Sequence, residues 1–497
     1  MRNVFLPLAA GIVAFIAALC ITSGHGPGLD PDSAAYLGAA GSLAHGDGLR
    51  VPMGKWENPD STVELTVWPP AFSAATAVPE MMGFAPLASA RLVIAAAAAT
   101  TAATLAVVLA GAVNLTVLCA AMLIVLVTPS FVGVHMSVLS EPLFIASLAV
   151  TLLAMVRGRP GLAAASATLA VMTRYAGASA ALGTAAWFLF FEKGAPRQRF
   201  LRAALSSAPA AVAFALWIAH NARVKVVQSA MSVEYYPGIG ATLREGLGTM
   251  LAWLAPGARG AAAAVIGGAV FLSLAAAGIS FFARRDARIE SDETSARRIS
   301  AAAAVLLTSY LAVLICSRLF IGGAIRFDAR ILSPAIFLIE VVAIALCGSA
   351  LADRGLTWRV VASLAAVMWM VAALAADAPA VLDSIEDGND FAASDWRESP
   401  TVEWVAREGA GHPIYTNWPA AIIFDARRNA YDIPGSTDAD TLALFGRILA
   451  SRKGLLAAFN ERSPDYPPID SIAAGAGLTR VREFSDGAIW AAGRNVK

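Results

Sequence analysis

The sequence has few charged residues for its length. Of its 497 residues, 15% are charged and 58% are hydrophobic, whereas soluble domains have about 25% charged and about 45–50% apolar residues. A water-soluble fold must cover its outside with polar groups, and a bilayer removes that requirement because lipid is itself an apolar solvent. The composition therefore argues against a wholly soluble protein and predicts a polytopic α-helical membrane protein.

Several chemical motifs are also missing. The five histidines show no metal-ligand spacing, and no P-loop, GxGxxG motif or nucleophile elbow is present. The sequence therefore identifies no metal site and no cofactor, although it leaves a divalent cation open. The formal net charge of +1 argues against a nucleic-acid partner, which requires a basic surface. The cysteines have no CxxC spacing and are interpreted as small core residues; they are Cys20, Cys119, Cys316 and Cys347.

Apolar runs of about 20 residues, the length that crosses a bilayer, recur along the chain. The N-terminal run is interpreted as an uncleaved first span, because it is longer than the core of a signal peptide. About eleven spans are predicted: 4–22, 88–111, 114–134, 141–156, 160–172, 176–192, 202–221, 261–283, 299–318, 332–350 and 357–377.

The basic residues of the short loops predict the orientation. Four clusters, around 157–159, 193–202, 284–298 and 354–359, all fall on the cytoplasmic side if the N-terminus is cytoplasmic, in agreement with the positive-inside rule. We therefore expect a multi-pass protein of the cytoplasmic (inner) membrane with a periplasmic or extracellular C-terminus. The loop 23–87, the turn near 135–140 and everything after about 378 are then external.

The external regions are expected to be folded. In the loop 23–87, an Asp/Ser pair followed by apolar residues at helical spacing predicts a short surface helix over 32–43, and Trp68-Pro69-Pro70 opens a second one. The chain is divided into a membrane domain, 1–377, and a small α/β domain, 378–497. In the latter, a helix is expected over 399–408, and strands over 413–416, 421–424, 454–459 and 488–492.

Two acidic sites are predicted at the outer membrane face. Asp30-Pro31-Asp32 follows the first span; it suits a general base for a reaction at the membrane surface, but Asp is also a common helix cap. Glu141, in Ser140-Glu141-Pro142, begins a span, where a helix N-terminus favours an acidic residue. Because the two sites lie at one depth, we expect a shared pocket.

Arginines are expected at the same face. Arg174, in Thr173-Arg174-Tyr175, lies between two apolar runs, where a charge is costly unless it is paired or reaches the interface. It is either an arginine that extends to the interface or a phosphate ligand. Arg326 and Arg330 run against the positive-inside bias, and a phosphate-bearing lipid head group would explain them.

In their order, these motifs resemble the GT-C membrane glycosyltransferases, in particular the bacterial group similar to dolichyl-phosphate-mannose–protein mannosyltransferases and aminoarabinose transferases. The resemblance covers most of the chain. Its elements in the first part of the chain are the acidic motif with Tyr36, the Trp68-Pro69-Pro70 helix, Ser140-Glu141-Pro142, Thr173-Arg174-Tyr175 and an Arg-containing element before a late span. The tail adds the segments 395–400 and 414–419 and the Arg427-Arg428 turn. The family often has Tyr after the late arginine, and Ile331 stands there in this sequence, which leaves the role of Arg330 open.

The resemblance implies a reaction. A sugar would leave a polyprenyl-phosphate donor and join a hydroxyl of a glycan, lipid or protein acceptor at the outer face, with inversion. Asp32 would be the base, with Asp30 as its helper and Glu141 as the second acidic site. Arg174, Arg326 and Arg330 would hold the leaving phosphate, and Tyr36, Trp68 and Tyr175 are further expected substrate-binding residues.

The sequence is also compatible with two other functional classes. A transporter or flippase of lipid-linked saccharides would place ionisable residues near the middle of the membrane. Glu340, in the predicted span 332–350, is such a residue, although most spans lack charges. A non-catalytic lipid-binding protein of the same fold is the second alternative.

Overall fold

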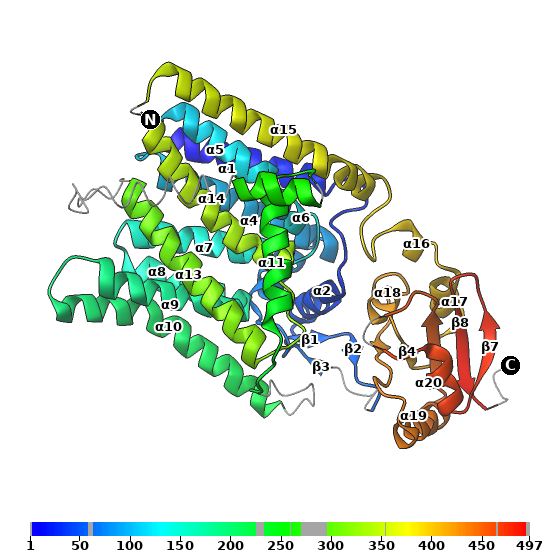
Figure 1. The fold of residues 1–497 in the computed structure, drawn as a ribbon. Coiled ribbons are helices and arrows are strands. Elements are labelled where there is room, and N and C mark those ends of the chain that lie inside the picture. Colours follow the sequence, from blue (N-terminus) through cyan, green and yellow to red (C-terminus); the bar gives the residue numbers. More distant parts are fainter. Residues whose placement is uncertain are drawn as a thin grey trace. The chain divides into compact units, whose positions relative to one another are not determined.

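The computed structural model describes residues 2–57, 63–224, 233–258, 260–269, 296–352, 354–463 and 466–493. The chain forms two compact units, coloured along the sequence in Figure 1. The first comprises Met1–Ile21, Val67–Phe72 and Leu92–Leu382. The second comprises Thr22–Thr66, Ser73–Arg91 and Asp383–Lys497. Each is described by itself below.

The first unit is helical, and most of α4 and α15 belong to it. Its elements are α1 (Arg2–Ile21), α4 (Pro86–Leu109), α5 (Leu115–Val127), α6 (Pro129–His135), α7 (Glu141–Val156), α8 (Pro160–Thr173), η1 (Tyr175–Gly177), α9 (Ala178–Ala186), η2 (Trp187–Phe191), α10 (Pro196–Arg223), α11 (Ile239–Leu254), α13 (Ala296–Phe320), α14 (Ala329–Ala352) and α15 (Leu356–Glu386).

Five of the described helices are long and apolar enough to cross a membrane: α4, α10, α13, α14 and α15. The pair α5–α6, bent by 56°, makes a sixth if it counts as one span. Four further predicted spans coincide with the shorter apolar helices α1, α7, α8 and the run from η1 to η2. The predicted span 261–283 lies outside the described residues beyond 269. A polytopic helical membrane protein is thus confirmed, and the count of eleven spans stays a prediction.

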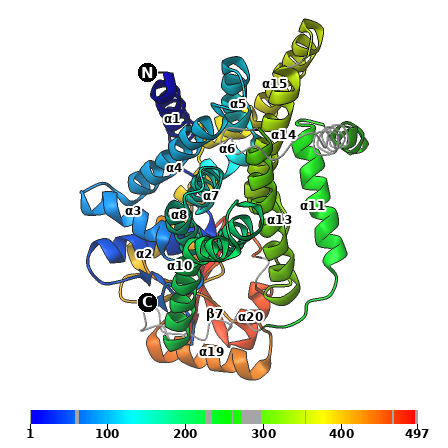
Figure 2. The ribbon, with the colours of Figure 1, turned by 90° about the vertical axis from the view of Figure 1, so that its left-hand side faces the viewer.

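Small residues allow these helices to pack closely. Helix α8 packs against α7, α9 and α10, and α13 packs against α9 and α14. Figure 2 shows α8 beside α7 and α10, and α13 beside α14. On α4, one face of alanines is buried, including Ala95, Ala98 and Ala102. Apolar side chains gain little from leaving lipid, so close backbone approach through small residues stabilises such contacts.

The sequence did not predict helix α11. Its 16 residues contain Arg244, Glu245 and three glycines, so no long apolar run marks it. Gly238 precedes it with φ of 91°, a left-handed conformation that glycine adopts without steric cost. Arg318 of α13 donates from Nε to Thr242 Oγ1 at 3.0 Å, which joins α11 to the bundle.

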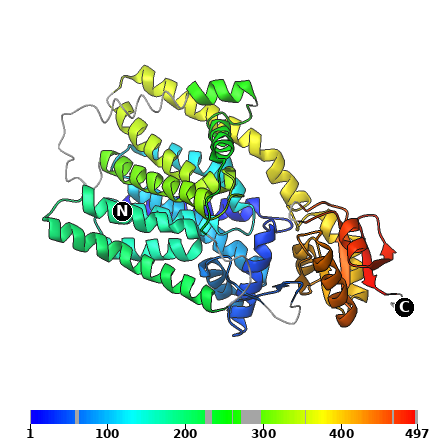
Figure 3. The same cartoon turned by 60° about the horizontal axis from the view of Figure 1, so that its bottom comes forward.

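The second unit is built around a six-stranded sheet of order β2-β5-β4-β6-β8-β7. Figure 1 labels β2, β4, β8 and β7 of this sheet, and Figure 3 shows the same unit turned forward. Strands β2 to β6 of this order run parallel, whereas β8 and β7 are antiparallel to their neighbours. The elements are α2 (Pro31–Ala44), β1 (Arg50–Val51), β2 (Met53–Gly54), β3 (Val63–Glu64), α3 (Ala71–Met81), α16 (Ser394–Arg397), α17 (Pro400–Glu408), β4 (Ile414–Thr416), α18 (Pro419–Phe424), β5 (Ala430–Tyr431), α19 (Ala439–Arg452), β6 (Leu455–Phe459), α20 (Ile469–Gly475), β7 (Leu478–Glu483) and β8 (Gly487–Ala492).

The loop 23–87 contributes a strand to this sheet. Strand β2 pairs with β5, and the Trp56 ring packs edge-on against Phe445 at 5.6 Å between ring centroids. Asp432 accepts from Lys55 Nζ and from the Trp56 backbone N–H, both at 2.7 Å. The predicted division into a membrane domain 1–377, which includes the loop, and an α/β domain from 378 stays a prediction. The second compact unit groups residues 22–66 and 73–91 with residues 383–497.

Most of the predicted elements of the tail and the loop are confirmed. The helix expected over 399–408 is α17, the strands expected over 413–416, 454–459 and 488–492 are β4, β6 and β8, and the helix expected over 32–43 is α2. The strand expected over 421–424 is wrong, because these residues form α18. A short apolar run does not distinguish helix from strand, and Pro419 at the first helical position favours the helix.

Candidate active site

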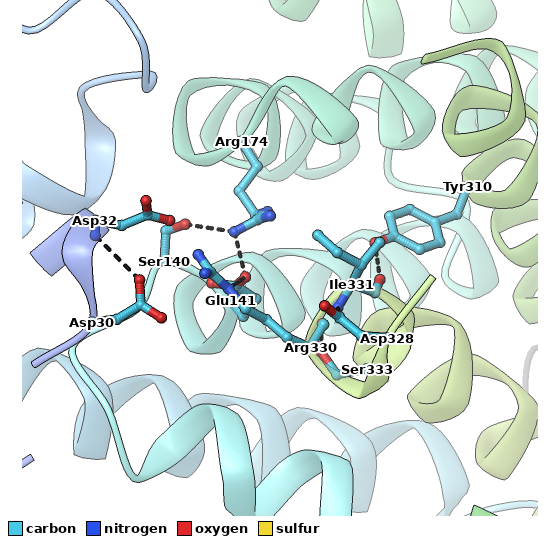
Figure 4. A network of polar contacts seen from close by, with 10 residues as sticks. All are labelled: Asp30, Asp32, Ser140, Glu141, Arg174, Tyr310, Asp328, Arg330, Ile331 and Ser333. Carbon is cyan, nitrogen blue, oxygen red and sulfur yellow. Dashed lines mark hydrogen bonds and ion pairs between the residues drawn. The ribbon is translucent and has the colours of Figure 1, made fainter. Parts of the chain in front are cut away.

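Three of the predicted residues meet in the first unit. The Glu141 carboxyl contacts Arg174 Nη1 at 2.6 Å and Arg330 Nε at 2.5 Å, both through Oε1 (Figure 4). Arg174 Nη1 also donates to Ser140 Oγ at 3.0 Å. The Glu141 side chain is 1% exposed, and those of Arg174 and Arg330 are 18% and 28% exposed. We call these three residues the Glu141 cluster: a buried carboxylate that holds two guanidinium groups at a partly open position.

Helix ends bring these residues together. Glu141 is the first residue of α7, Arg174 lies in extended conformation between α8 and η1, and Arg330 is in the first turn of α14. The N-terminus of α7 stabilises the Glu141 charge, but the same helix polarity disfavours Arg330 at the start of α14. The Glu141 carboxylate offsets that cost by forming an ion pair with Arg330. The buried carboxylate in turn needs a cationic partner.

Neighbouring contacts fix the start of α14. Tyr310 of α13 is buried and donates from its hydroxyl to Ile331 O at 2.6 Å. Asp328 Oδ1 accepts from the Ile331 backbone N–H at 2.9 Å, as a helix cap does. Ser333 Oγ donates to Arg330 O at 2.8 Å. These contacts, drawn in Figure 4, position the backbone that carries Arg330.

Other predicted residues of this unit have different neighbours. Arg326 contacts Glu245 of α11 at 2.6 Å, and its side chain is 74% exposed. The Tyr175 hydroxyl accepts from Trp217 Nε1 and Asn221 Nδ2, each at 3.2 Å, so it faces α10. Trp68 is half-buried and belongs to the short Val67–Phe72 stretch of this unit.

The acidic pair lies in the second unit, at the start of α2. Asp30 is the N-cap of this helix, and its Oδ1 accepts from the Asp32 backbone N–H at 3.1 Å (Figure 4). Pro31 occupies the first helical position, which its fixed φ suits. Asp32 lies in the first turn, and Tyr36, one turn later, is 1% exposed. Of the two acids in the motif, Asp30 is therefore the one that caps the helix. The expectation of a pocket shared with Glu141 stays a prediction.

Sequence reasoning missed two residues of the first unit that support the cluster. Tyr310 lies within an apolar run that a membrane span already explains, so no local pattern identifies it as a residue of the site. Asp328 was visible between Arg326 and Arg330, and an acidic residue just before a helix is a recognisable capping signal. Within the described ranges, no group of three or more His, Cys, Asp or Glu residues has the geometry to hold a metal ion.

The sequence matches no protein-family model and no curated protein. Solved structures are similar over almost the whole chain. ArnT from Cupriavidus metallidurans, bound to undecaprenyl phosphate, is 14% identical with a TM-score of 0.58 over 98% of this chain and 97% of its own.

Two further structures are also similar. The arabinofuranosyltransferase AftD from Mycobacteria is 16% identical with a TM-score of 0.56 over 98% of this chain, which spans 40% of AftD. The archaeal oligosaccharyltransferase AglB from Archaeoglobus fulgidus, in complex with an inhibitory peptide and a dolichol-phosphate, is 12% identical with a TM-score of 0.53 over 91% of this chain and 69% of its own.

These similar proteins are membrane glycosyltransferases of the GT-C class. At such low identity, the likeness is one of fold, and fold alone does not determine activity. The helical bundle and the C-terminal α/β region of this chain therefore have the architecture of a GT-C glycosyltransferase, as the order of its sequence motifs indicated.

Proposed function

We propose that the protein is an integral membrane glycosyltransferase that moves a sugar from a polyprenyl-phosphate donor to an acceptor hydroxyl at the outer face of the cytoplasmic membrane. The Glu141 cluster is the observation that carries this proposal. Two guanidinium groups, each able to bind phosphate oxygens in a bidentate manner, are held by a buried carboxylate and remain partly exposed. The donor class is taken from ArnT, bound to undecaprenyl phosphate, and from AglB, bound to a dolichol-phosphate.

In the proposed reaction, the Asp32 carboxylate accepts the proton of the acceptor hydroxyl. The acceptor oxygen then bonds to the anomeric carbon, and the bond from that carbon to the phosphate oxygen breaks. The phosphate leaves with the electron pair, and the sugar is inverted. Arg174 and Arg330 stabilise the charge that develops on the phosphate, and Asp30 holds the first turn that carries Asp32.

Glu141 has a different proposed role from Asp32. Two arginines contact its buried carboxyl, so taking up a proton there would weaken both ion pairs. We therefore propose Glu141 as a positioning residue for the two phosphate ligands. Arg326, paired with Glu245, is the weaker candidate for the same phosphate.

The proposed topology has eleven spans, a cytoplasmic N-terminus and an external C-terminus. The basic loop clusters support it. A fusion of alkaline phosphatase to the C-terminus should be active, because this enzyme works outside the cytoplasm. Activity found only with a cytoplasmic reporter at the same position would contradict the topology.

The function is tested by sugar transfer in membranes. Membranes containing the wild-type chain or Asp32→Asn are incubated with radiolabelled polyprenyl-phosphate sugars and with acceptor extracts of the cell envelope. We expect label in the acceptor fraction only with the wild-type chain, at equal protein levels. Export of intact lipid-linked sugar without cleavage of its phosphate bond would favour a transporter instead, and equal transfer by both proteins would refute the proposed base.

A further inference from the structure

The second unit contains a cavity at the end of its parallel strands. Strands β4 and β6 are parallel, so their carboxyl ends meet at one edge of the sheet, where open α/β sheets bind ligands. A cavity of about 490 Å³ opens beside the residues that follow β6, within the range of about 300–1,000 Å³ typical of ligand sites. We call it the tail cavity.

A hydrogen-bonded asparagine fixes this edge of the sheet. Asn417, which follows β4, donates from Nδ2 to Phe459 O at 3.1 Å and to Glu461 O at 3.2 Å. It also accepts from the Phe459 backbone N–H at 2.9 Å. Trp418 Nε1 donates to Glu461 O at 3.0 Å. The segment from Phe459 to Glu461, which lines the tail cavity, is therefore held rigidly.

An aromatic cluster forms one part of the cavity wall. Trp396 and Phe459 line the cavity, and their ring centroids lie 5.1 Å apart in an edge-to-face arrangement. Phe391 and Trp418 pack against Trp396 at 4.9 Å and 6.2 Å. Trp396 is only half-buried despite these three neighbours. A fixed, accessible indole ring offers a flat apolar surface at little cost in side-chain entropy.

Carboxyl groups, which accept hydrogen bonds, form the other part of the cavity wall. Asp395, Glu398, Glu461 and Asp486 line the cavity, and no Lys or Arg is among its described lining residues. Asp486 is oriented by the hydroxyls of Ser399 and Thr401, the latter at 2.7 Å. Because all the lining charges are negative, an anionic ligand would be repelled. The cavity suits a ligand that has an apolar face and several neutral donors.

We propose that the tail cavity binds an uncharged saccharide. The C–H face of a sugar ring packs on an aromatic side chain, and its hydroxyls donate to carboxylates. The inference also identifies the acceptor of the proposed reaction as a neutral glycan, and in that respect it rests on the proposed function. Saccharide binding itself requires neither the donor lipid nor the Glu141 cluster.

The test is glycan binding by the full-length chain in lipid nanodiscs, without any donor lipid. The chain is applied to an array of neutral, anionic and amino-sugar oligosaccharides, and the free form of any retained glycan is then titrated by calorimetry. We expect retention of neutral oligosaccharides. No retention of any neutral glycan, or retention of anionic glycans alone, would overturn the proposal.

Matched tryptophan variants locate the binding. Trp396→Ala should weaken binding at least ~10-fold, as truncation of a central aromatic contact commonly does. Trp404→Ala is the control, because Trp404 belongs to α17, packs against Phe484 and does not line the tail cavity. Equal binding by both variants would contradict the assignment.

A second variant guards against misfolding of Trp396→Ala. Glu398 is exposed, so Glu398→Ala should leave the melting temperature unchanged and still weaken glycan binding several-fold. A trilysine peptide tests the competing occupant: if it binds more tightly than any neutral glycan, and Glu398→Ala abolishes its binding, the cavity is a cation site and the proposal is wrong.

The two proposals fail separately. Asp32→Asn should bind the glycan like the wild-type chain while its rate of sugar transfer falls by at least about 100-fold. Glycan binding without any transfer by the wild-type chain would refute the glycosyltransferase proposal alone. Transfer that is unaffected by Trp396→Ala and Glu398→Ala would refute the role of the tail cavity in acceptor binding.

Discussion

The two acidic motifs of this chain differ in what their carboxyl groups contact. In the helical unit, Glu141 begins α7, is 1% exposed and forms ion pairs with two arginines. In the sheet-containing unit, Asp30 precedes α2 and its carboxyl contacts the backbone N–H of Asp32. Both motifs contain a proline beside the acid and both begin a helix, so the sequence presents them as similar features.

The difference shows that a helix N-terminus supports more than one task for an acid. A buried carboxylate with two cationic partners is suited to hold those partners in place, because the loss of its negative charge would leave both arginines without this anionic partner. A capping carboxyl group, such as that of Asp30, is suited to hold the first helical turn, and this turn carries the second acid, Asp32. The predictions below separate these roles, from the largest expected effect to the smallest.

The largest effect is expected within the acidic pair. Asp32→Asn should lower the transfer rate by about 10²–10⁴-fold, the usual contribution of a placed base, and leave expression and donor binding intact. Asp30→Asn keeps a side-chain oxygen that can cap the helix, so this variant should lose much less transfer activity. Initial rates with radiolabelled donor measure both. The opposite order would exchange the two roles, and full activity of both single variants and of the double variant would refute the mechanism.

Glu141→Gln should destabilise the helical unit by about 3 kcal/mol, because a buried ion-pair partner is removed, and should weaken donor binding. Glu192→Gln is a matched control: Glu192 is also largely buried and also contacts two arginines, Arg298 and, at 3.2 Å, Arg202. Thermal unfolding and binding of labelled polyprenyl phosphate are measured in detergent. If both variants lose donor binding equally, the effect reflects stability rather than positioning.

A smaller effect is expected from the two arginines near the start of α14. Arg330→Ala should weaken binding of the polyprenyl phosphate by about 10–100-fold, the range for a charged hydrogen bond. Arg326→Ala should change it by less than about threefold, because its exposed ion pair with Glu245 contributes little. Equilibrium binding at several salt concentrations tests this. A larger loss in Arg326→Ala would make Arg326 the phosphate ligand.

The smallest effect concerns the tail. Burial raises the pKa of the Asp425 carboxyl to about 6, and the Arg397 guanidinium opposes this shift. The folded state therefore binds the proton more tightly than the unfolded chain. The resulting stabilisation is complete below about pH 4 and is lost as the pH rises through 6.

Asp425→Asn imitates the protonated form. It should raise the stability of the tail at pH 7.5 by about 1 kcal/mol, a value reduced for partial solvent screening, and have little effect at pH 4. Melting curves of the full chain at both pH values measure this. Asp47→Asn, at an exposed position, is the control, and the same pH dependence in Asp425→Asn as in the wild-type chain would contradict the prediction.

Local patterns were enough to predict many elements. Long apolar runs mark α4, α13 and α14 because a helix satisfies its own backbone hydrogen bonds in lipid. Short apolar segments of the tail likewise predicted β4 and β8, and the segment 399–408 was expected to form the helix that is α17. Prediction failed where local signals were ambiguous, as in the short apolar run of α18, or weak, as in the glycine-containing α11.

The candidate site was predicted in composition but not in arrangement. The sequence by itself determined that Glu141, Arg174 and Arg330 lie at helix ends, because charged residues interrupt apolar runs there. Only the tertiary structure decided that these three meet, since Glu141 and Arg330 are 189 residues apart in the chain. It likewise decided that β2, from the loop 23–87, joins the tail sheet. Such contacts depend on how helices and strands pack, and a local sequence pattern carries no information about a partner so distant along the chain.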